Sequence, residues 1–352
     1  MAYASITKPS SHFNTKLYTG TDASNAITGV GFQPDFTWIK NRNDNYTHTL
    51  TDAVRGATKY IMTSSSDGNN TNAQFLKSFD SDGFTVGTAG RLNYNNYTYA
   101  SWNWKAGTTG SGTTGGSGSA QSYSYSVNTT AGFSIVKYTG NATAGHTIPH
   151  HLGAVPKMIL FKQLTGSNVD WRVYHEAIGN THRLCLNDSS ASNNDDSAFN
   201  DTSPTSSVFT VGGSSSTNPS ADVVAYCFAE KKGYSKFGSY TGNGNADGTF
   251  IYLGFKPAFI MVRRTDSANN WTMYDNKRNT SFNEITHTLI ANSNDAEATS
   301  TSDDDCDFLS NGVKMRCTNN GSNGGGASYI YMAFAEEPLV ANVGASIPAT
   351  AR

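Results

Sequence analysis

The sequence is short of charged residues and of cysteine. Asp, Glu, Lys and Arg make up 15% of its 352 residues, and the formal net charge is −2. A nucleic-acid-binding surface needs Lys and Arg in clustered excess, so this composition disfavours a nucleic-acid partner. The four cysteines are Cys185, Cys227, Cys306 and Cys317. Because none lies before residue 185, no disulfide framework spans the whole chain.

Long apolar runs are also missing. The sequence has no stretch of 18 apolar residues, and its start has no apolar core of the kind that a secretion signal requires. We therefore predict no membrane insertion and expect the chain to fold in a cytoplasm.

The apolar residues that are present form short runs. They make up 37% of the chain, are rich in Tyr, Phe, Val and Ile, and are separated by segments dense in Gly, Ser, Thr and Asn. Alternation of apolar and polar residues, as in 36–40 and 97–104, is typical of strands. The composition thus predicts an all-β protein with long polar loops.

One motif occurs three times. Tyr-Thr-Gly begins at residues 18, 138 and 240, and a proline follows at 34, 156 and 257. A glycine stands three residues before each proline, and a basic residue stands six residues after it, as Lys40, Lys162 and Arg263. A period of about a hundred residues indicates tandem domains and not a solenoid of short units.

The repeat divides the chain into three copies with flanking segments. These are a leader (1–14), copy one (15–106), a Gly/Ser/Thr-rich linker (107–130), copy two (131–230), copy three (234–337) and a tail (338–352). For each copy we predict an antiparallel β-sandwich of jelly-roll or lectin-like type. The linker has the composition of a flexible tether, so we expect copy one to stand away from copies two and three, which pack as a pair.

Two kinds of polar cluster could carry chemistry. His146, His150 and His151 lie close together in copy two only, and form either a metal site or an exposed polar loop. Aspartates at 195–196 and 303–305 lie in Asn/Ser-rich loops. They lack the separated pair that a glycosidase needs and the alternating ligands of a calcium loop. We predict neither an enzyme nor a cofactor or metal.

Two further positions have two interpretations each. His175 stands where copy one has Asp52 and copy three has Asp275, and either lines a site or is a satisfied polar group at a sheet edge. Cys306 and Cys317 bracket a predicted turn, and are either a disulfide or two small buried thiols.

Aromatic side chains among Asn, Ser and Gly are the best candidates for binding. The candidate residues are Tyr94, Tyr97, Tyr123, Tyr125, Trp171 and Trp271. Such neighbours combine flat apolar faces with hydrogen-bonding edges, as paratopes and sugar sites do. The alternative is that many of these rings pack inside the sandwiches.

Several longer sequence segments resemble those of a known protein family. They include Lys8-Pro-Ser-Ser-His-Phe-Asn-Thr-Lys-Leu-Tyr-Thr-Gly, Gly31-Phe-Gln-Pro-Asp-Phe-Thr-Trp-Ile-Lys and Tyr331-Met-Ala-Phe-Ala-Glu-Glu-Pro. With these phrases the chain resembles, over essentially its whole length, a large family of repeat-containing virion proteins of tailed bacteriophages, many from marine hosts. The resemblance implies a β-sandwich structural protein of the phage particle, of the kind labelled tail fibre or lectin-like. It brings no catalytic or binding residues.

The residues and the resemblance together lead to a functional hypothesis. We expect a non-enzymatic virion protein, assembled in the host cytoplasm, that acts as a tail-associated fibre or receptor-binding protein in host attachment. Capsid decoration is the alternative, and a polysaccharide depolymerase is a third possibility. The expected partners are copies of itself, other virion proteins and a host surface glycan or receptor. We expect copy one to anchor the protein and copies two and three to point outward.

Overall fold

The computed structural model describes residues 4–279, 282–299 and 304–339. Strands dominate these residues and form several antiparallel sheets, which confirms the predicted all-β fold. The helical segments described are single turns, η1 (Pro9–Ser11), α1 (Gly90–Asn93) and α2 (Asp196–Phe199). The predicted tail lies outside the described residues from position 340 onward.

Copy one is a sandwich of two sheets. The larger sheet has the strand order β1 (Phe13–Thr19), β9 (Thr98–Trp104), β3 (Phe36–Asn41), β4 (Thr49–Asp52), β5 (Lys59–Met62), β6 (Asn70–Thr71). The smaller sheet has the order β2 (Asn25–Thr28), β8 (Gly83–Val86), β7 (Leu76–Asp80). Apolar side chains such as Phe84 and Tyr99 fill the space between them.

Copy two repeats this plan with additional strands. Its larger sheet has the order β10 (Thr108–Thr113), β12 (Ser122–Asn128), β13 (Phe133–Thr139), β20 (Asp222–Phe228), β15 (Met158–Gln163), β16 (Arg172–His175). The smaller sheets are β11 (Gly115–Gly116), β14 (His146–Pro149), β19 (Val208–Val211) and the pair β17 (His182–Arg183), β18 (Asn193–Asn194).

Copy three has the same two-sheet plan as copy one. Its larger sheet has the order β21 (Ser235–Thr241), β29 (Ser328–Pro338), β23 (Phe255–Arg264), β24 (Trp271–Asp275), β25 (His287–Ile290), β26 (Ala298–Thr299). The smaller sheet has the order β22 (Phe250–Tyr252), β28 (Gly312–Met315), β27 (Cys306–Leu309). The repeated prolines Pro34 and Pro156 precede β3 and β15, whereas Pro257 lies inside β23, where the pairing with β29 shifts register. A bulge accommodates proline because the ladder is already interrupted there.

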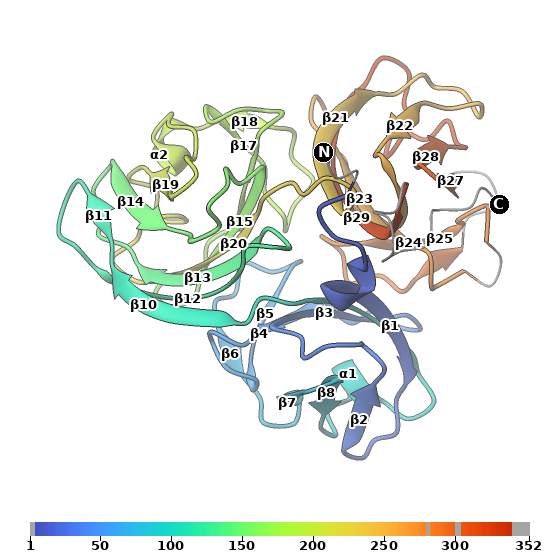
Figure 1. Cartoon of the computed structure of the whole chain (residues 1–352), viewed down its shortest axis with the longest axis horizontal. Coiled ribbons are helices and arrows are strands. Elements are labelled where there is room, and N and C mark those ends of the chain that lie inside the picture. Colours follow the sequence, from blue (N-terminus) through green and yellow to red (C-terminus); the bar gives the residue numbers. More distant parts are fainter. Residues whose placement is uncertain (1–3, 280–281, 300–303, 340–352) are drawn as a thin grey trace.

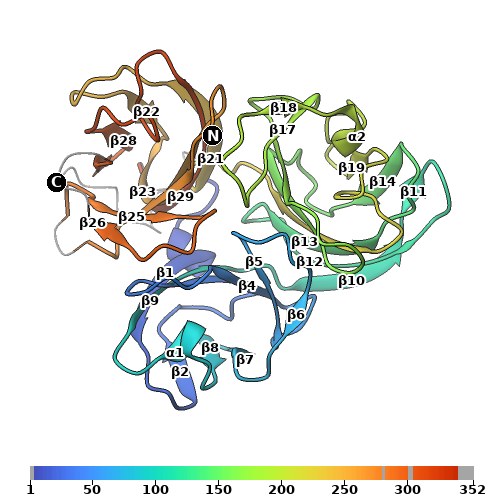
Figure 2. The ribbon, with the colours of Figure 1, turned by 180° about the vertical axis from the view of Figure 1, so that it is seen from behind.

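The three copies surround a common centre (Figures 1 and 2). A central core takes apolar side chains from all three of them. At its middle the rings of Trp104, Phe228 and Phe334, one from the last strand of each copy, have centroids 6.3, 6.0 and 5.5 Å apart. Burial of a large apolar side chain contributes about 1.5–3 kcal/mol, so removal of one copy would expose a large part of this core. The copies are therefore parts of one folding unit, and the expectation that copy one stands away from copies two and three is wrong.

The predicted linker is part of a sheet. Strands β10 and β12 lie within it and extend the larger sheet of copy two by pairing with β13. Gly110 lies opposite Tyr125 and Gly112 opposite Tyr123. A Cβ atom at these glycines would lie 2.6 and 2.8 Å from the two tyrosine hydroxyls. The glycines thus leave room for rings that cover the strand, so this segment is not a flexible tether.

The leader is also packed against the body. Ile6 is buried in the central core, and the Ser5 amide donates a hydrogen bond to the Lys232 carbonyl at 2.8 Å. The leader thus connects copy one to the joint between copies two and three.

Candidate binding surfaces

Trp171 and Trp271 lie between copies and not at the surface. Trp171 is fully buried, and its indole N–H donates to the Met62 carbonyl of copy one at 2.9 Å. Trp271 is equally buried and donates to the Cys185 carbonyl of copy two at 2.8 Å. In copy one the position is taken by His48, which is also buried. The prediction that these two tryptophans are surface binding residues is wrong, because each of them joins neighbouring copies.

The basic residue that follows each repeated proline also joins copies. Lys40, Lys162 and Arg263 are fully buried. Each donates to a backbone carbonyl of a neighbouring copy, at Asn294, Ser66 and Ser190 respectively. Burial lowers the pKa of both lysines to about 8 and that of Arg263 to about 10. These cations stabilise loops between the copies and are not available to a ligand.

Two aspartates at equivalent positions make a third set of contacts between copies. Asp52 of copy one accepts a hydrogen bond from the Tyr226 hydroxyl of copy two at 2.7 Å. Asp275 of copy three accepts one from the Trp102 indole of copy one at 3.0 Å. Each carboxylate also pairs with the arginine three residues further on, at 2.5 and 2.6 Å. Burial of these acids is tolerated because each is paired and hydrogen-bonded.

His175 completes this set in copy two. Its Nε2 bonds the Tyr331 carbonyl of copy three at 3.1 Å, and its Nδ1 accepts from the Ala177 amide at 3.1 Å. By strand register, Met332 stands where the other copies have the donors Trp102 and Tyr226. A thioether donates no hydrogen bond, so a histidine that bonds the backbone fits here better than an aspartate. His175 is thus a satisfied polar group, at an interface between copies.

The Tyr-Thr-Gly motif is explained by packing inside each copy. Its tyrosine hydroxyl donates to a carbonyl next to a fully buried asparagine. The pairs are Tyr18 with Leu92, Tyr138 with Thr217 and Tyr240 with Ser322, and the asparagines are Asn93, Asn218 and Asn323. Its glycine has no space for a side chain, since a Cβ on Gly140 would lie 2.0 Å from the Pro219 oxygen. The motif therefore marks the fold and not a ligand site.

Tyr94 and Tyr97 do lie at the surface of copy one. Tyr94 is 46% exposed, and its ring centroid is 4.7 Å from that of Tyr97. Tyr46 lies beside them. Both rings border Gly90, since a Cβ atom built on this glycine would be 3.1 Å from the Tyr94 ring and 3.9 Å from the Tyr46 hydroxyl. Partial desolvation, the nearby Asp44 carboxylate and the other two tyrosines raise the pKa of Tyr97. We name Tyr46, Tyr94 and Tyr97 the tyrosine cluster.

A buried tyrosine holds this cluster in place. The Tyr99 hydroxyl donates to the Gly90 carbonyl at 2.8 Å and accepts from the Tyr94 amide at 2.7 Å and from Asn41 Nδ2 at 3.1 Å. Beside the cluster, Asn43 Oδ1 accepts from the amide and hydroxyl of Thr98 at 2.6 and 2.8 Å. The exposed Tyr94 ring and the half-buried Tyr97 are therefore carried on an ordered turn and rimmed by amides. Sequence reasoning missed Tyr46, although the segment 43–46, like 93–97, combines asparagines with tyrosine.

Tyr123 and Tyr125 form a second aromatic group, with His151. Tyr125 and His151 stack with centroids 3.8 Å apart, and the Tyr123 hydroxyl bonds His151 Nε2 at 3.0 Å. Tyr123 is only 9% exposed and Tyr125 is partly buried. The Tyr123 hydroxyl is hydrogen-bonded to His151 and the Tyr125 ring is stacked on it, so these two tyrosines offer less free surface than the tyrosine cluster.

The three histidines of copy two do not converge on one point. His146 is buried and bonds Asn218 Oδ1 at 2.9 Å, while His150 is buried and bonds the Thr205 carbonyl at 3.1 Å. Burial lowers the pKa of His150 to about 4. The interpretation as a metal site is not supported, and neither of these two residues belongs to an exposed loop.

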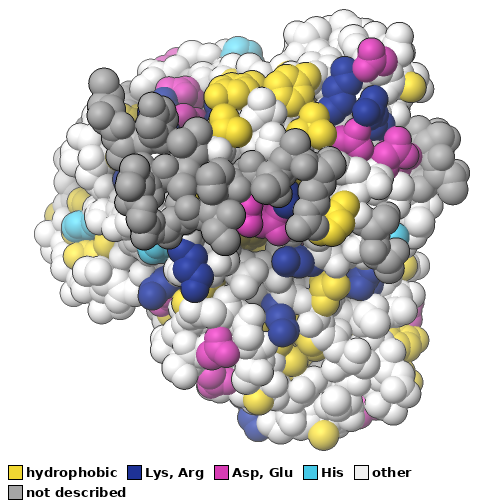
Figure 3. Space-filling model, turned by 45° about the vertical axis from the view of Figure 1, so that its right-hand side comes forward, with side chains coloured by type: hydrophobic (Ala, Val, Ile, Leu, Met, Phe, Trp, Pro, Cys, Tyr) yellow, Lys and Arg dark blue, Asp and Glu magenta, His cyan; other side chains and the backbone are white. Residues whose placement is uncertain are grey.

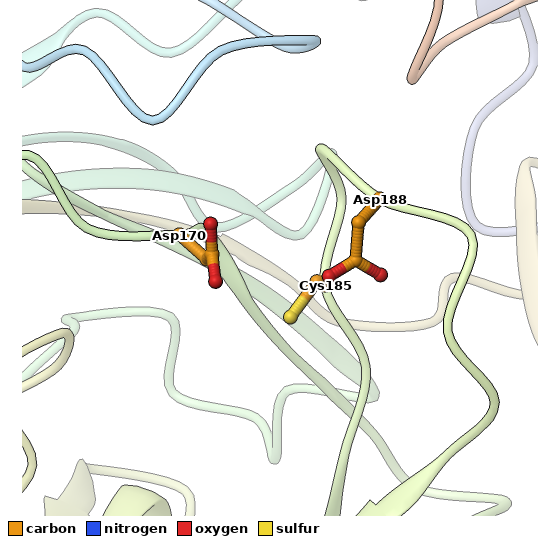
Figure 4. A group of neighbouring side chains, drawn as sticks. All are labelled: Asp170, Cys185 and Asp188. Atoms are coloured by element: carbon orange, nitrogen blue, oxygen red, sulfur yellow. The ribbon is translucent and has the colours of Figure 1, made fainter.

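One group of potential metal ligands occurs within the described residues. Ligand atoms of Asp170, Cys185 and Asp188 lie within 4.8 Å of one another (Figure 4). However, Arg172 and Arg183 approach the Cys185 sulfur at 3.3 and 3.1 Å, and burial raises the pKa of this thiol to about 11. A metal needs a deprotonated thiolate and would compete with two guanidinium groups. We therefore assign no metal to this group.

The remaining sequence alternatives concern Cys and Asp. All four cysteines are free and buried, so Cys306 and Cys317 are two buried thiols and not a disulfide. Asp195 pairs with Arg183 at 2.6 Å. The run 303–305 lies partly outside the described residues.

Comparison with known proteins places the chain in a family. It belongs to the family described as a domain of unknown function (DUF7483), and the match covers residues 8–338. One family unit thus spans all three copies and the second half of the leader, in agreement with their common core. No curated protein and no solved structure matches the chain. Among the described residues, no helix has the length and apolar character needed to cross a membrane.

Proposed function

We propose that this protein is a non-enzymatic structural component of a phage particle, and that the tyrosine cluster of copy one attaches it to a glycan or receptor on the host surface. The observation that carries the proposal is the exposure of Tyr94 beside Tyr97 and Tyr46, on a turn that Tyr99 fixes. The sequence resemblance to repeat-containing virion proteins supports the location in the particle.

The chemistry of the cluster suits a sugar. The C–H face of a sugar ring packs on a flat aromatic ring, and its hydroxyls bond to amides and carboxylates at the rim. Asn43 and Asp44 are exposed and stand at that rim. A single site of this size binds weakly, and many copies on one particle multiply its strength through avidity.

A second candidate function is decoration of the capsid. It is favoured by the rigid three-copy body, because the Gly/Ser-rich segment is a strand of copy two and supplies no swinging arm. In this function the protein would stabilise the particle, and the tyrosine cluster would contact another virion protein.

The test uses the full chain, since a fragment would expose the central core. Labelled wild-type protein, the triple variant Y46A/Y94A/Y97A and the control Y252A are compared for binding to host cells and to a glycan array. Tyr252 is 54% exposed on copy three, so Y252A is the control for loss of an exposed tyrosine ring outside the cluster. We expect wild type and Y252A to bind and the triple variant to lose at least tenfold in affinity. Equal binding by the triple variant would exclude the cluster. Binding to particles that lack the protein, without binding to cells, would favour decoration.

A further inference from the structure

The equivalent sheet edges of copies two and three differ. In copy two, β13 is covered on its outer side by β12, which runs antiparallel to it. In copy three, the equivalent strand β21 ends the strand order of its sheet within the described residues. An uncovered edge strand presents backbone N–H and C=O groups that can pair with another strand.

The outward groups of β21 follow from its pairing with β29. Tyr234 accepts a hydrogen bond from the Ala335 amide, and the Gly242 amide donates to the Ala327 carbonyl. Because residues alternate in an antiparallel pair, the odd-numbered Phe237 and Ser239 direct their backbone groups away from β29. The Phe237 amide is 3.4 Å from a Glu230 carboxylate oxygen, a long contact that a new strand can replace.

An exposed aromatic ring stands beside this edge. Tyr252 occupies in copy three the position of His151 in copy two, since each directly precedes a Leu-Gly pair. His151 is covered by Tyr125 of β12 at 3.8 Å, whereas Tyr252 is 54% exposed and has Lys236 Nζ 5.0 Å from its ring centroid. Figure 3, which brings the side of copy three forward, shows hydrophobic side chains grouped near the top of the view beside basic and acidic ones.

We propose that β21 of copy three accepts an extended strand from a partner protein, antiparallel to it, with an aromatic side chain that stacks on Tyr252 as Tyr125 stacks on His151. The chain contains the pattern for this occupant in β12, where tyrosine alternates with serine. Main-chain hydrogen bonds would supply most of the affinity and the aromatic contact the specificity. This proposal does not depend on the attachment function of the tyrosine cluster.

Copy one offers an internal contrast. Within the described residues its strand β1 also ends a sheet, but the position of His151 and Tyr252 is taken by Gly29. Copy one thus has an edge strand but no aromatic side chain at the position of Tyr252. We therefore expect the strand to bind copy three and not copy one.

The probe is a fluorescent peptide with the sequence of residues 120–129, which contains β12. It is titrated against the full-length protein by anisotropy, and hydrogen exchange locates the protected amides. We expect saturable binding with slower exchange at Phe237 and Ser239 and no change in β1. A peptide with Ser in place of Tyr125, and the protein variant Y252A, should each bind about tenfold more weakly, the upper end of what an aromatic pair contributes.

Two protein variants complete the test. S239P removes an outward N–H from an edge strand, where proline is tolerated, and should abolish binding while leaving the thermal midpoint close to that of wild type. Y94A, in the tyrosine cluster, should bind the peptide as wild type does. The proposal is overturned by the absence of saturable binding up to about 1 mM, the affinity limit of weak recognition, or by equal protection of β1. Unchanged peptide affinity in Y252A and S239P would also overturn the proposal. Self-association of the protein that S239P abolishes would overturn it too, because the occupant of the edge would then be a second copy.

Discussion

The indole N–H of Trp102 donates to the carboxylate of Asp275, a residue 173 positions later in the chain, at 3.0 Å. This bond joins copy three to copy one. A backbone hydrogen bond repeats at each of the three junctions, from Asn69 to Leu164, from Ser192 to Thr265 and from Glu297 to Arg42. The three copies therefore form a closed ring in which each copy contacts both others.

Removal of the Asp275 carboxylate should destabilise the whole protein. D275A leaves the Trp102 N–H without its acceptor and removes the carboxylate that pairs with buried Arg278 at 2.6 Å. We expect a loss of about 3 kcal/mol in the free energy of unfolding, measured in urea. The control is E176A, because the Glu176 side chain is 51% exposed in its ion pair with Lys157. It should cost less than about 1 kcal/mol, and equal losses in the two variants would contradict the role of Asp275.

The motif glycine should not tolerate a methyl group. G140A would place a Cβ 2.0 Å from the Pro219 oxygen, which is backbone and cannot rotate away. We expect a destabilisation of about 3 kcal/mol, near the upper end for overpacking. Gly213 is the matched control, since nothing lies within 4 Å of its Cβ position. Thermal melts of G140A and G213A that coincide would disprove the steric explanation.

Acidification should weaken the fold through His175. Burial lowers the pKa of His175 to about 4 from 6.5, so below pH 6.5 the unfolded chain binds a proton that the native protein does not. Stability contributed by the neutral ring is present above pH 6.5 and is lost as the pH falls toward 4, by up to about 3 kcal/mol. The variant H175Q keeps a donor for the Tyr331 carbonyl but does not titrate. Unfolding free energies between pH 8 and 4 should therefore fall less in H175Q, and parallel curves would refute the prediction.

The strand within the Gly/Ser-rich segment should depend on its glycines. G110V would place side-chain atoms where the Tyr125 ring lies, since even a Cβ there is 2.6 Å from the hydroxyl. We expect faster hydrogen exchange in β10 and β12 and loss of the stacking between Tyr125 and His151. The control S111V changes an exposed residue of the same strand to one that favours strands. If G110V leaves exchange unchanged, the glycine does not position the ring.

The sequence predicted the features that depend on neighbouring or repeated residues, and few of the contacts between residues distant in the chain. The repeated motif and alternating apolar residues were sufficient for the copies and their all-β fold. The burial of Trp171 could not be read from its surroundings, because its acceptor belongs to Met62 in another copy. The composition of 107–122 suggested a tether because glycine has no side chain, whereas the rings that cover Gly110 and Gly112 come from a neighbouring strand.

The candidate site was predicted in part for the same reason. Tyr94 and Tyr97 are neighbours in sequence and lie together at the surface. Tyr46 joins them only because the strands β3 and β9 pair, which brings the loop after β3 to the turn before β9. Contacts that depend on strand pairing can be identified only once the fold is known.

Calorimetric unfolding of the full-length protein tests most directly whether the three copies form one ring around one core. We predict a single transition whose calorimetric and van't Hoff enthalpies agree, and a shift of that entire transition to lower temperature in D275A. Two or three separable transitions, with D275A affecting only one of them, would show that the copies fold independently and would contradict the account.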